Sequence, residues 1–324
     1  MAQHFLLSSA AKSLSLVKVA RMSNEEAFEA FKAIRWAETE GNPVCPHCNC
    51  GACYTYKARK IFKCKACEKQ FSVTSGTIFA DRKLPIRDYL LAIAIFVNGA
   101  KGYSMLQLSR DLSISYKAAF VLAHKLREAV SAEQAADEKL TGEVEIDGGY
   151  FGGHIRPANK KENRIDRRRA RYQTGKRRVV VVMRERNGRT LPYVFKTEAA
   201  SVPHIGNYVD HNATVYADEA LHWDALHARF LTKRINHQKA YSTDEACTNQ
   251  AESFFSRLRR AEIGTHHHIS GKYLGAYALE MAWREDRRRN SNGEQFLEMA
   301  RASLLHPVSN QWKGYWRKAS NAAA

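Results

Sequence analysis

Two closely spaced cysteine pairs near the N-terminus have the spacing of a structural metal site. Fifteen residues separate the pairs, whose members are Cys45, Cys48, Cys64 and Cys67. Two thiolates so close along the chain can converge on one Zn²⁺ ion, which prefers four such ligands in a tetrahedron. The alternating run that follows, from Lys69 to Thr74, is typical of a strand. The sequence therefore predicts a zinc ribbon with a structural Zn²⁺ ion within residues 42–80.

The other cysteines leave alternatives open. Cys50 and Cys53 could replace one of the pairs, or the paired cysteines could be buried or unpaired thiols. We expect Cys50 and Cys53 to be bystanders, because pairing them leaves the turn that follows Cys45 unexplained. Cys247 stands alone and is interpreted as a core residue, since an isolated free cysteine behaves as a small apolar side chain.

Three acidic residues in the second half of the chain could form another metal site. Asp147 ends one strand-like run, Asp218 follows another, and Glu252 lies on a later amphipathic segment. Carboxylates that meet repel one another unless cations lie between them, and hard oxygen ligands favour Mg²⁺ or Mn²⁺. Two such ions can activate an attacking oxygen and stabilise a leaving oxygen in phosphodiester chemistry. Taken singly, each acid could instead be a surface or capping residue; Asp218 could cap the helix after it.

The segment with Glu252 carries a second charge on the same helical face. Arg259 follows Glu252 by seven residues, which is two helical turns. The carboxylate could therefore bind the metal ions while the guanidinium contacts a phosphate backbone. The alternative is a pair of exposed charges on a solvated helix, which contribute little.

A predicted alternation of strands and helices positions these acids. The predicted strands are 143–147, 179–183, 191–197, 213–217 and 230–235, and the predicted helices are 201–211, 223–229, 248–260 and 272–288. The first strand is expected to end in a bend at Gly148-Gly149. This order is that of a ribonuclease H-like domain, in which the first and fourth strands are neighbours. Asp147 and Asp218 would then meet at one edge, and a late helix packed there would add Glu252.

Residues 85–131 predict three helices with a tight turn between the last two. The helices begin at Pro85, after Ser104 and at Ser115. This pattern fits a helix-turn-helix, whose last helix enters the major groove of DNA by its N-terminal end. A plain helical hairpin fits the spacing equally well. In the DNA-binding interpretation, Lys117 and Lys125 on the third helix contact DNA.

The charge of the chain favours a polyanionic partner. The 324 residues include 51 Lys+Arg and 33 Asp+Glu, a net charge of +18. Residues 154–178 contribute eleven basic and two acidic side chains. We expect this stretch to be a solvated loop that becomes ordered on a phosphate backbone, with Arg167, Arg168 and Arg169 among its DNA contacts.

Nothing in the sequence predicts a membrane span. The apolar run Leu90–Val97 is eight residues long, and a span needs roughly 18. Thiolates available for zinc imply a reducing compartment. Residues 1–24 lack acids and superficially fit an organelle transit peptide, but no cleavage pattern accompanies them, and a basic arm is the better interpretation.

With these residues in view, the chain resembles the DDE-type transposases of bacterial insertion sequences, in the ISXO-like group that has an N-terminal zinc ribbon. The resemblance covers about residues 23–290 and is carried by a set of short motifs. These are the two cysteine pairs, Phe71–Phe79, Val144–Gly153, Ala217-Asp218, Thr248–Ser256, Ile263–Ser270 and Tyr273-Leu274.

The resemblance implies a function and a set of site residues. It implies binding of transposon ends and target DNA, hydrolytic strand cleavage and strand transfer with a divalent metal, in a homodimer or higher multimer on DNA. Asp147 and Asp218 correspond to the first two catalytic acids, and the 33 residues between Asp218 and Glu252 fit the third. Arg259 stands where many relatives have Lys. Some relatives use Asn in the third role, so Asn249, on the same face as Glu252, is an alternative.

We therefore expect a multidomain α/β protein of the bacterial cytoplasm, associated with the nucleoid. Its parts are predicted as a basic arm and helix (1–41, with Ser23 capping a helix over 24–40), a zinc ribbon (42–80), a helix-turn-helix (85–132), a ribonuclease H-like catalytic domain (140–290) and a C-terminal tail (291–324). The alternative function is a zinc-ribbon DNA-binding regulator whose large domain is inactive.

Overall fold

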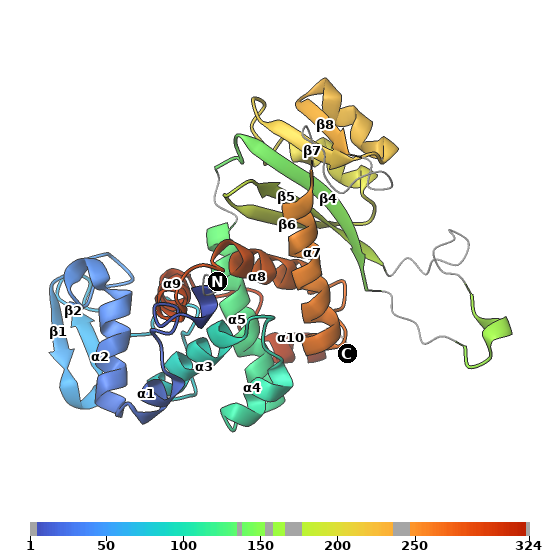
Figure 1. Cartoon of the computed structure of the whole chain (residues 1–324). Coiled ribbons are helices and arrows are strands. Elements are labelled where there is room, and N and C mark those ends of the chain that lie inside the picture. Colours follow the sequence, from blue (N-terminus) through green and yellow to red (C-terminus); the bar gives the residue numbers. More distant parts are fainter. Residues whose placement is uncertain (1–4, 135–137, 153–157, 166–176, 236–246, 322–324) are drawn as a thin grey trace. The chain divides into compact units, whose positions relative to one another are not determined.

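The computed structural model describes residues 5–134, 138–152, 158–165, 177–235 and 247–321 (Figure 1). The chain divides into two compact units. Unit 1 comprises Met1–Glu133 and Arg287–Ala324, and unit 2 comprises Gln134–Asp286. The protein is thus of mixed α/β type, and its C-terminal segment folds together with the N-terminal part.

A small antiparallel sheet in unit 1 carries the cysteine pairs. Its strands pair in the order β1-β2-β3; they are β1 (Cys53–Tyr56), β2 (Ile61–Cys64) and β3 (Gln70–Ser72). Helix α2 (Asn24–Arg35) packs against this sheet through aromatic rings. The Phe62 ring of β2 lies 6.4 Å from Phe28 and 5.4 Å from Trp36. These rings supply the apolar core that so small a sheet could not bury alone.

Helix α2 begins where the sequence predicted and ends earlier. Ser23 and Glu26 form a reciprocal capping box at its N-terminus. The prediction extended the helix to residue 40, but it ends at Arg35, because a 3-10 turn and the left-handed Glu40 redirect the chain. The Arg35 guanidinium donates hydrogen bonds to the carbonyl oxygens after β3, including that of Val73 at 2.6 Å.

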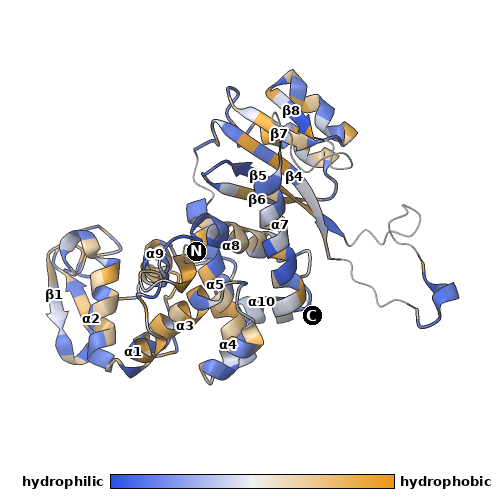
Figure 2. Ribbon diagram, viewed as in Figure 1, coloured by the Kyte–Doolittle hydropathy of each residue, from blue (hydrophilic) through white to orange (hydrophobic). Residues whose placement is uncertain are grey.

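The three helices predicted after the ribbon are present. They are α3 (Ile86–Asn98), α4 (Met105–Asp111) and α5 (Tyr116–Gln134). Helix α3 is apolar along most of its length and almost fully buried (Figure 2). Ser104 and Ser115 each accept a backbone hydrogen bond at the start of the following helix, as N-caps do. A left-handed Ser113 makes the tight turn between α4 and α5.

Unit 1 contains further helices that the sequence analysis did not predict. They are α1 (Leu16–Arg21), α9 (Asn292–Leu305) and α10 (Tyr315–Asn321). Helix α9 has its own capping box, formed by Ser291 and Glu294, and packs on α2 and α3.

Unit 2 is built on a five-stranded sheet in the order β6-β5-β4-β7-β8. The strands are β4 (Glu143–Phe151), β5 (Arg178–Glu185), β6 (Thr190–Phe195), β7 (Thr214–Asp218) and β8 (Leu231–Ile235). Strands β4, β5 and β6 form an antiparallel meander. Strand β7 lies parallel to β4, and β8 lies parallel to β7. The first and fourth strands of this sheet are therefore neighbours, as predicted.

Different elements pack on the two faces of this sheet. Val144 and Ile146 of β4 contribute to an apolar core that Trp223 and Leu226 complete on one face. Helix α7 (Asn249–Ala261) packs on β4 and β5, and α8 (Leu274–Asp286) packs on β6.

Two predictions about unit 2 are wrong in detail. The helix predicted over 201–211 is only α6 (Val202–Ile205), because Tyr208 and Asp210 hydrogen-bond to the backbone of Leu140 instead. Strand β4 does not end at Gly148-Gly149 but continues to Phe151, with Gly148 opposite Val181 of β5. A Cβ on Gly149 would lie 2.7 Å from the Phe255 ring of α7, so the glycine allows the helix to approach the strand.

Among the described residues, no helix is long and apolar enough to cross a membrane.

Candidate functional site

The four predicted zinc ligands lie together in unit 1. The Sγ atoms of Cys45 and Cys67 are 3.6 Å apart, and those of Cys48 and Cys64 are 3.5 Å apart. All four sulfur atoms lie within 4.8 Å of one another. A zinc tetrahedron with Zn–S bonds of about 2.3 Å has edges of about 3.8 Å. The donor set therefore fits one Zn²⁺ ion.

The two cysteine pairs have the same backbone arrangement. The N–H of Cys45 donates to the carbonyl oxygen of Cys50, and that of Cys64 donates to Lys69, five residues on in each case. The fourth residue after each first cysteine is left-handed, Asn49 with φ of 57° and Glu68 with φ of 58°. Each pair is thus a locally closed turn that presents two thiols from one side.

Backbone amides favour the thiolate form of one ligand. The N–H groups of Cys67 and Ala66 point at Cys64 Sγ, at 3.5 and 3.3 Å. These hydrogen bonds, that of Cys67 first, lower the pKa of the Cys64 thiol to about 6. Because zinc binds the thiolate, these amides favour metal binding at Cys64.

Cys50 and Cys53 lie outside the group of four. Cys50 contributes its carbonyl oxygen to the first turn, and Cys53 stands opposite Cys64 across the β1–β2 ladder. Burial raises the pKa of the Cys53 thiol to about 11, with the other cysteines adding to the rise. This environment keeps Cys53 protonated, as a bystander would be.

The first two predicted acids lie on adjacent strands of unit 2. Strands β4 and β7 pair in parallel with Glu145 opposite Tyr216. Continuing this register by two residues brings Asp147 opposite Asp218, at the end of β7. Asp218 also accepts a hydrogen bond from the N–H of Ala220 at 3.1 Å, so it caps the following turn as well.

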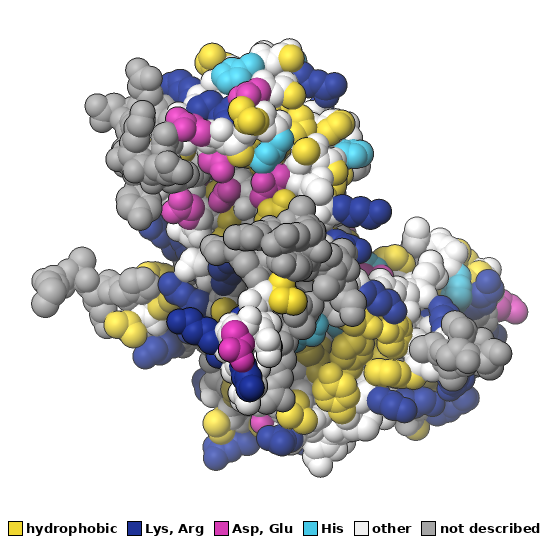
Figure 3. Space-filling model, turned by 90° about the vertical axis from the view of Figure 1, so that its right-hand side faces the viewer, with side chains coloured by type: hydrophobic (Ala, Val, Ile, Leu, Met, Phe, Trp, Pro, Cys, Tyr) yellow, Lys and Arg dark blue, Asp and Glu magenta, His cyan; other side chains and the backbone are white. Residues whose placement is uncertain are grey.

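Asp147 is the electrostatic centre of an acidic group. Burial raises the pKa of its carboxyl to about 7; the hydrogen bond from the Gly148 N–H opposes this, and the charges of Asp218, Glu198 and Glu252 add to it. Asp147 therefore lies close enough to the other two predicted acids for their charges to act on it. Figure 3 shows several acidic side chains gathered on one side of unit 2.

Glu198 is a member of this group that the sequence analysis missed. A Cβ on Gly148 would lie 2.5 Å from Glu198 Oε1, so the glycine next to Asp147 leaves room for this carboxylate. Burial, and then the charge of Asp218, raise the pKa of Glu198. His222 Nε2 lies 3.2 Å from Glu198 Oε2. Glu198 follows β6 in an irregular segment, and no sequence pattern marks it.

The buried Glu145 fixes the start of α7 against β4. It is fully buried and accepts hydrogen bonds from the N–H groups of Gln250 and Ala251, at 2.8 and 3.0 Å. Arg186 Nε donates to its other oxygen at 3.0 Å. A carboxylate at a helix N-terminus satisfies exposed amides and complements the helix dipole. The alternation Glu143-Glu145-Asp147 was a signal for this role, since all three side chains point to one face.

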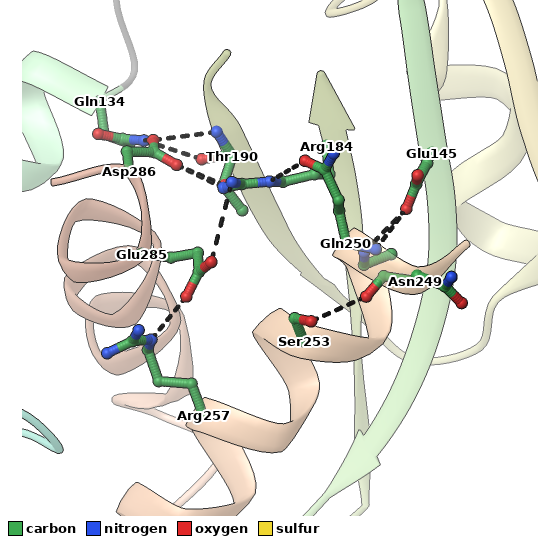
Figure 4. A network of polar contacts seen from close by, with 11 residues as sticks. Gln134, Glu145, Arg184, Thr190, Asn249, Gln250, Ser253, Arg257, Glu285 and Asp286 are labelled. Atoms are coloured by element: carbon green, nitrogen blue, oxygen red, sulfur yellow. Dashed lines mark hydrogen bonds and ion pairs between the residues drawn. The ribbon is translucent and has the colours of Figure 1, made fainter. Parts of the chain in front are cut away.

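A polar network continues from this anchor under α7 and α8 (Figure 4). The buried Arg184 of β5 donates to Gln250 Oε1 at 3.4 Å and forms a 2.6 Å ion pair with Asp286 of α8. Glu285 of α8 accepts a 2.8 Å hydrogen bond from Arg257 of α7. Both helices are thereby tied to the sheet and to each other, which sets the position of the side chains that α7 carries.

The remaining predicted residues of α7 lie at different depths. Glu252 is partly buried, whereas Asn249 and Arg259 are exposed. The Arg259 guanidinium lies 5.4 Å from the centre of the Phe151 ring, at the end of β4.

Glu280, on α8, forms a buried ion pair with Arg284 at 2.8 Å.

Among the residues that the structure describes, the cysteines are the one group whose ligand atoms all lie within metal-binding distance. The acidic residues repel one another without reaching that distance. Partly buried carboxylates are the type of oxygen donor that hard divalent cations bind.

The structure describes some of the predicted DNA-contacting residues and not others. Lys117 is exposed at the start of α5, and Lys125 is half-buried further along it. Arg167, Arg168 and Arg169 lie outside the described residues.

Two segments of the chain match known protein families. Residues 139–286 match the ISXO2-like transposase domain, and residues 22–70 match the transposase zinc-ribbon domain. A protein of Halobacterium salinarum, described as an uncharacterized protein in transposable element ISH50, is 23% identical over 296 residues. The similarity covers 87% of this chain and 98% of that protein.

Proposed function

Because the chain belongs to the family of ISXO2-like transposases with a zinc ribbon, we propose that it is a DDE-type enzyme that binds insertion-sequence ends and cleaves and joins DNA strands there. The observation that carries the proposal is the acidic group around Asp147, whose pKa is raised by burial and by three neighbouring carboxylates. A regulator without catalysis has no need for repelling carboxylates. The order and directions of the strands in unit 2 support a ribonuclease H-like catalytic domain.

Each residue has a proposed role. Asp147, Asp218 and Glu252 would hold two Mg²⁺ or Mn²⁺ ions, which would supply activation of the attacking oxygen and stabilisation of the leaving oxygen. Glu145 and Arg184 would orient α7 so that Glu252 lies near Asp147 and Asp218. Arg259 would bind a backbone phosphate, and the exposed Asn249 would position DNA or the adjacent loop.

The DNA-binding parts are proposed from charge and position. The zinc ribbon and a helix-turn-helix formed by α4 and α5 would bind the element ends, with Lys117 and Lys125 near the duplex. Arg167, Arg168 and Arg169 would bind phosphates without choice of sequence. The protein would act as a homodimer or higher multimer on DNA, at the nucleoid in the cytoplasm. The proposal keeps the five-part domain division that was predicted from the sequence.

The experiment is a cleavage and binding assay on duplexes that carry the terminal repeats of the DNA flanking the gene. Glu252→Gln keeps the shape of the side chain and removes its charge, so cleavage with Mg²⁺ should fall by orders of magnitude while end binding persists. Asn249→Ala should lower cleavage less than Glu252→Gln does. Glu219→Gln, which changes an exposed acid next to Asp218, is the matched control and should cleave normally.

The outcomes separate the alternatives. If Asn249→Ala abolishes cleavage and Glu252→Gln does not, the amide holds the third role. If the protein binds the ends but never cleaves, the zinc-ribbon regulator with an inactive large domain is the better description.

A further inference from the structure

Unit 1 contains a pocket that the proposed catalytic and metal sites do not use. Its volume is 340 Å³, and it lies between the first turns of α5, the loop at residues 80–84 and the segment at α10. Pockets of this size accommodate small planar ligands. Both aromatic and basic side chains line it; the residues that the argument uses are Tyr89, Trp312, Trp316, Arg82, Lys117 and Lys125.

Trp316 forms a fixed aromatic surface in this pocket. Its indole N–H donates to the carbonyl oxygen of Lys117 at 3.3 Å, and its ring packs 5.8 Å from that of Phe120. The Lys117 ammonium lies 5.4 Å from the centre of the ring. The side chain is nevertheless 38% exposed, so part of it remains open to a ligand.

The charges around the pocket select an anionic ligand. Among the described residues that line it, Asp81 is the only acid, and it pairs with Lys313 at 3.1 Å. Five basic side chains also line it: Arg82, Lys83, Lys117, Lys125 and Arg317. Cations beside exposed aromatic rings are the combination by which proteins bind unpaired nucleotides, because every base has a face that can stack.

We propose that this pocket receives an unpaired nucleobase of a DNA end, stacked on Trp316, with the adjacent phosphates near Lys117 and Lys125. This inference rests on the proposed function and deepens it, since it names a DNA structure that unit 1 recognises beside the duplex: an end with unpaired bases. It also gives α10 a role, which is to complete the pocket over α5.

Binding of two labelled duplexes to the full-length, zinc-loaded protein tests the proposal. One duplex has blunt ends, and the other has the same sequence with a short unpaired thymidine overhang. The protein should bind the overhang duplex more tightly. Trp316→Ala should reduce that preference about five-fold to 150-fold, the factor that stacking of one base represents. Trp316→Phe should retain most of it.

Tyr54→Ala is the matched control. Tyr54 is an exposed aromatic residue that also has a lysine over its ring, Lys65 at 4.8 Å, but it lies on the ribbon outside the pocket. This variant should keep the ratio of the two affinities, because any effect of the ribbon on end binding acts on both duplexes alike. Fluorescence of 2-aminopurine in the overhang needs no variant, and stacking should quench it on binding.

The results distinguish this inference from the proposed function. If the wild-type protein binds neither duplex, the proposed DNA-binding function fails. If it binds both equally, if 2-aminopurine stays bright, or if folded Trp316→Ala keeps the preference, only the pocket inference is overturned.

Discussion

In the cysteine cluster, the ligands come from two short turns whose own backbone hydrogen bonds present the thiols. In the acidic group, they come from two strands, a helix and an irregular segment of unit 2. The cysteine sulfur atoms already lie within 4.8 Å of one another, whereas the carboxylates do not. Neutral thiols can be packed together without a metal, but partly buried carboxylates repel one another. Local chain geometry therefore suffices for the first site, and the second depends on tertiary packing and on its cation.

The largest expected effect comes from removing zinc. Chelation, or Cys64→Ser, should unfold residues 42–80 while unit 2 keeps its structure, because structural zinc contributes about 10–16 kcal/mol in small zinc domains. Metal analysis of the purified protein should find one zinc per chain. Hydrogen exchange by segment would measure the selective loss, and protein free of zinc with a folded ribbon would contradict it.

For the acidic group we predict that the stability of the protein depends on pH through the raised pKa of Asp147. The folded pKa of Asp147, about 7, lies above its ordinary value of 3.8. Its contribution to stability is therefore fully present below about pH 4 and is lost as the pH rises through 7. Without divalent metal, Asp147→Asn should become more stable than the wild type as the pH rises, by up to about 4 kcal/mol.

Added Mg²⁺ should reverse that order. It should raise the melting temperature of the wild-type protein at pH 8 and leave that of Asp147→Asn nearly unchanged, since a ligand stabilises only the state that binds it. Thermal unfolding at several pH values, with and without Mg²⁺, measures both effects. Parallel curves for the two proteins would show that Asp147 belongs to no cation site.

A smaller effect should come from the anchor of α7. Glu145→Gln removes a buried charge that two helix amides and Arg186 contact, and it should lower the free energy of unfolding by roughly 1–3 kcal/mol. Glu143→Gln is the matched control, because Glu143 contacts the same arginine at 3.0 Å but is half exposed. Equal losses in urea unfolding would mean that burial of Glu145 is unimportant.

The smallest expected effect concerns DNA binding by residues outside both sites. Replacing Arg167, Arg168 and Arg169 with Ala should flatten the salt dependence of DNA binding, with the slope falling by up to about 3. Preference among DNA sequences should stay the same, as binding titrations at several salt concentrations would show. A changed preference with an unaltered slope would mean that these arginines contact bases.

Much of the fold could be predicted because its signals are local. The serine caps of α2, α4 and α5 and the alternating strands of unit 2 follow from residues close together in the sequence. The two errors in unit 2 occurred where distant residues compete. The helix predicted over 201–211 loses its second half because the backbone there bonds to Leu140. Strand β4 continues through two glycines because it stays paired with β5, and the glycines leave room for Glu198 and Phe255.

The sequence by itself determined the close spacing of the four cysteines, the charge of the chain and the presence of Asp147 on β4 and Asp218 on β7. Spacing within a turn and alternation within a strand are short-range geometry, so they can be inferred without a structure. Only the tertiary structure decided that Glu198 joins the acidic group, that Glu145 anchors α7, and that Trp316 packs against α5. Those relations join residues from 51 to about 200 positions apart, and their energies depend on burial, which the chain acquires only when it folds.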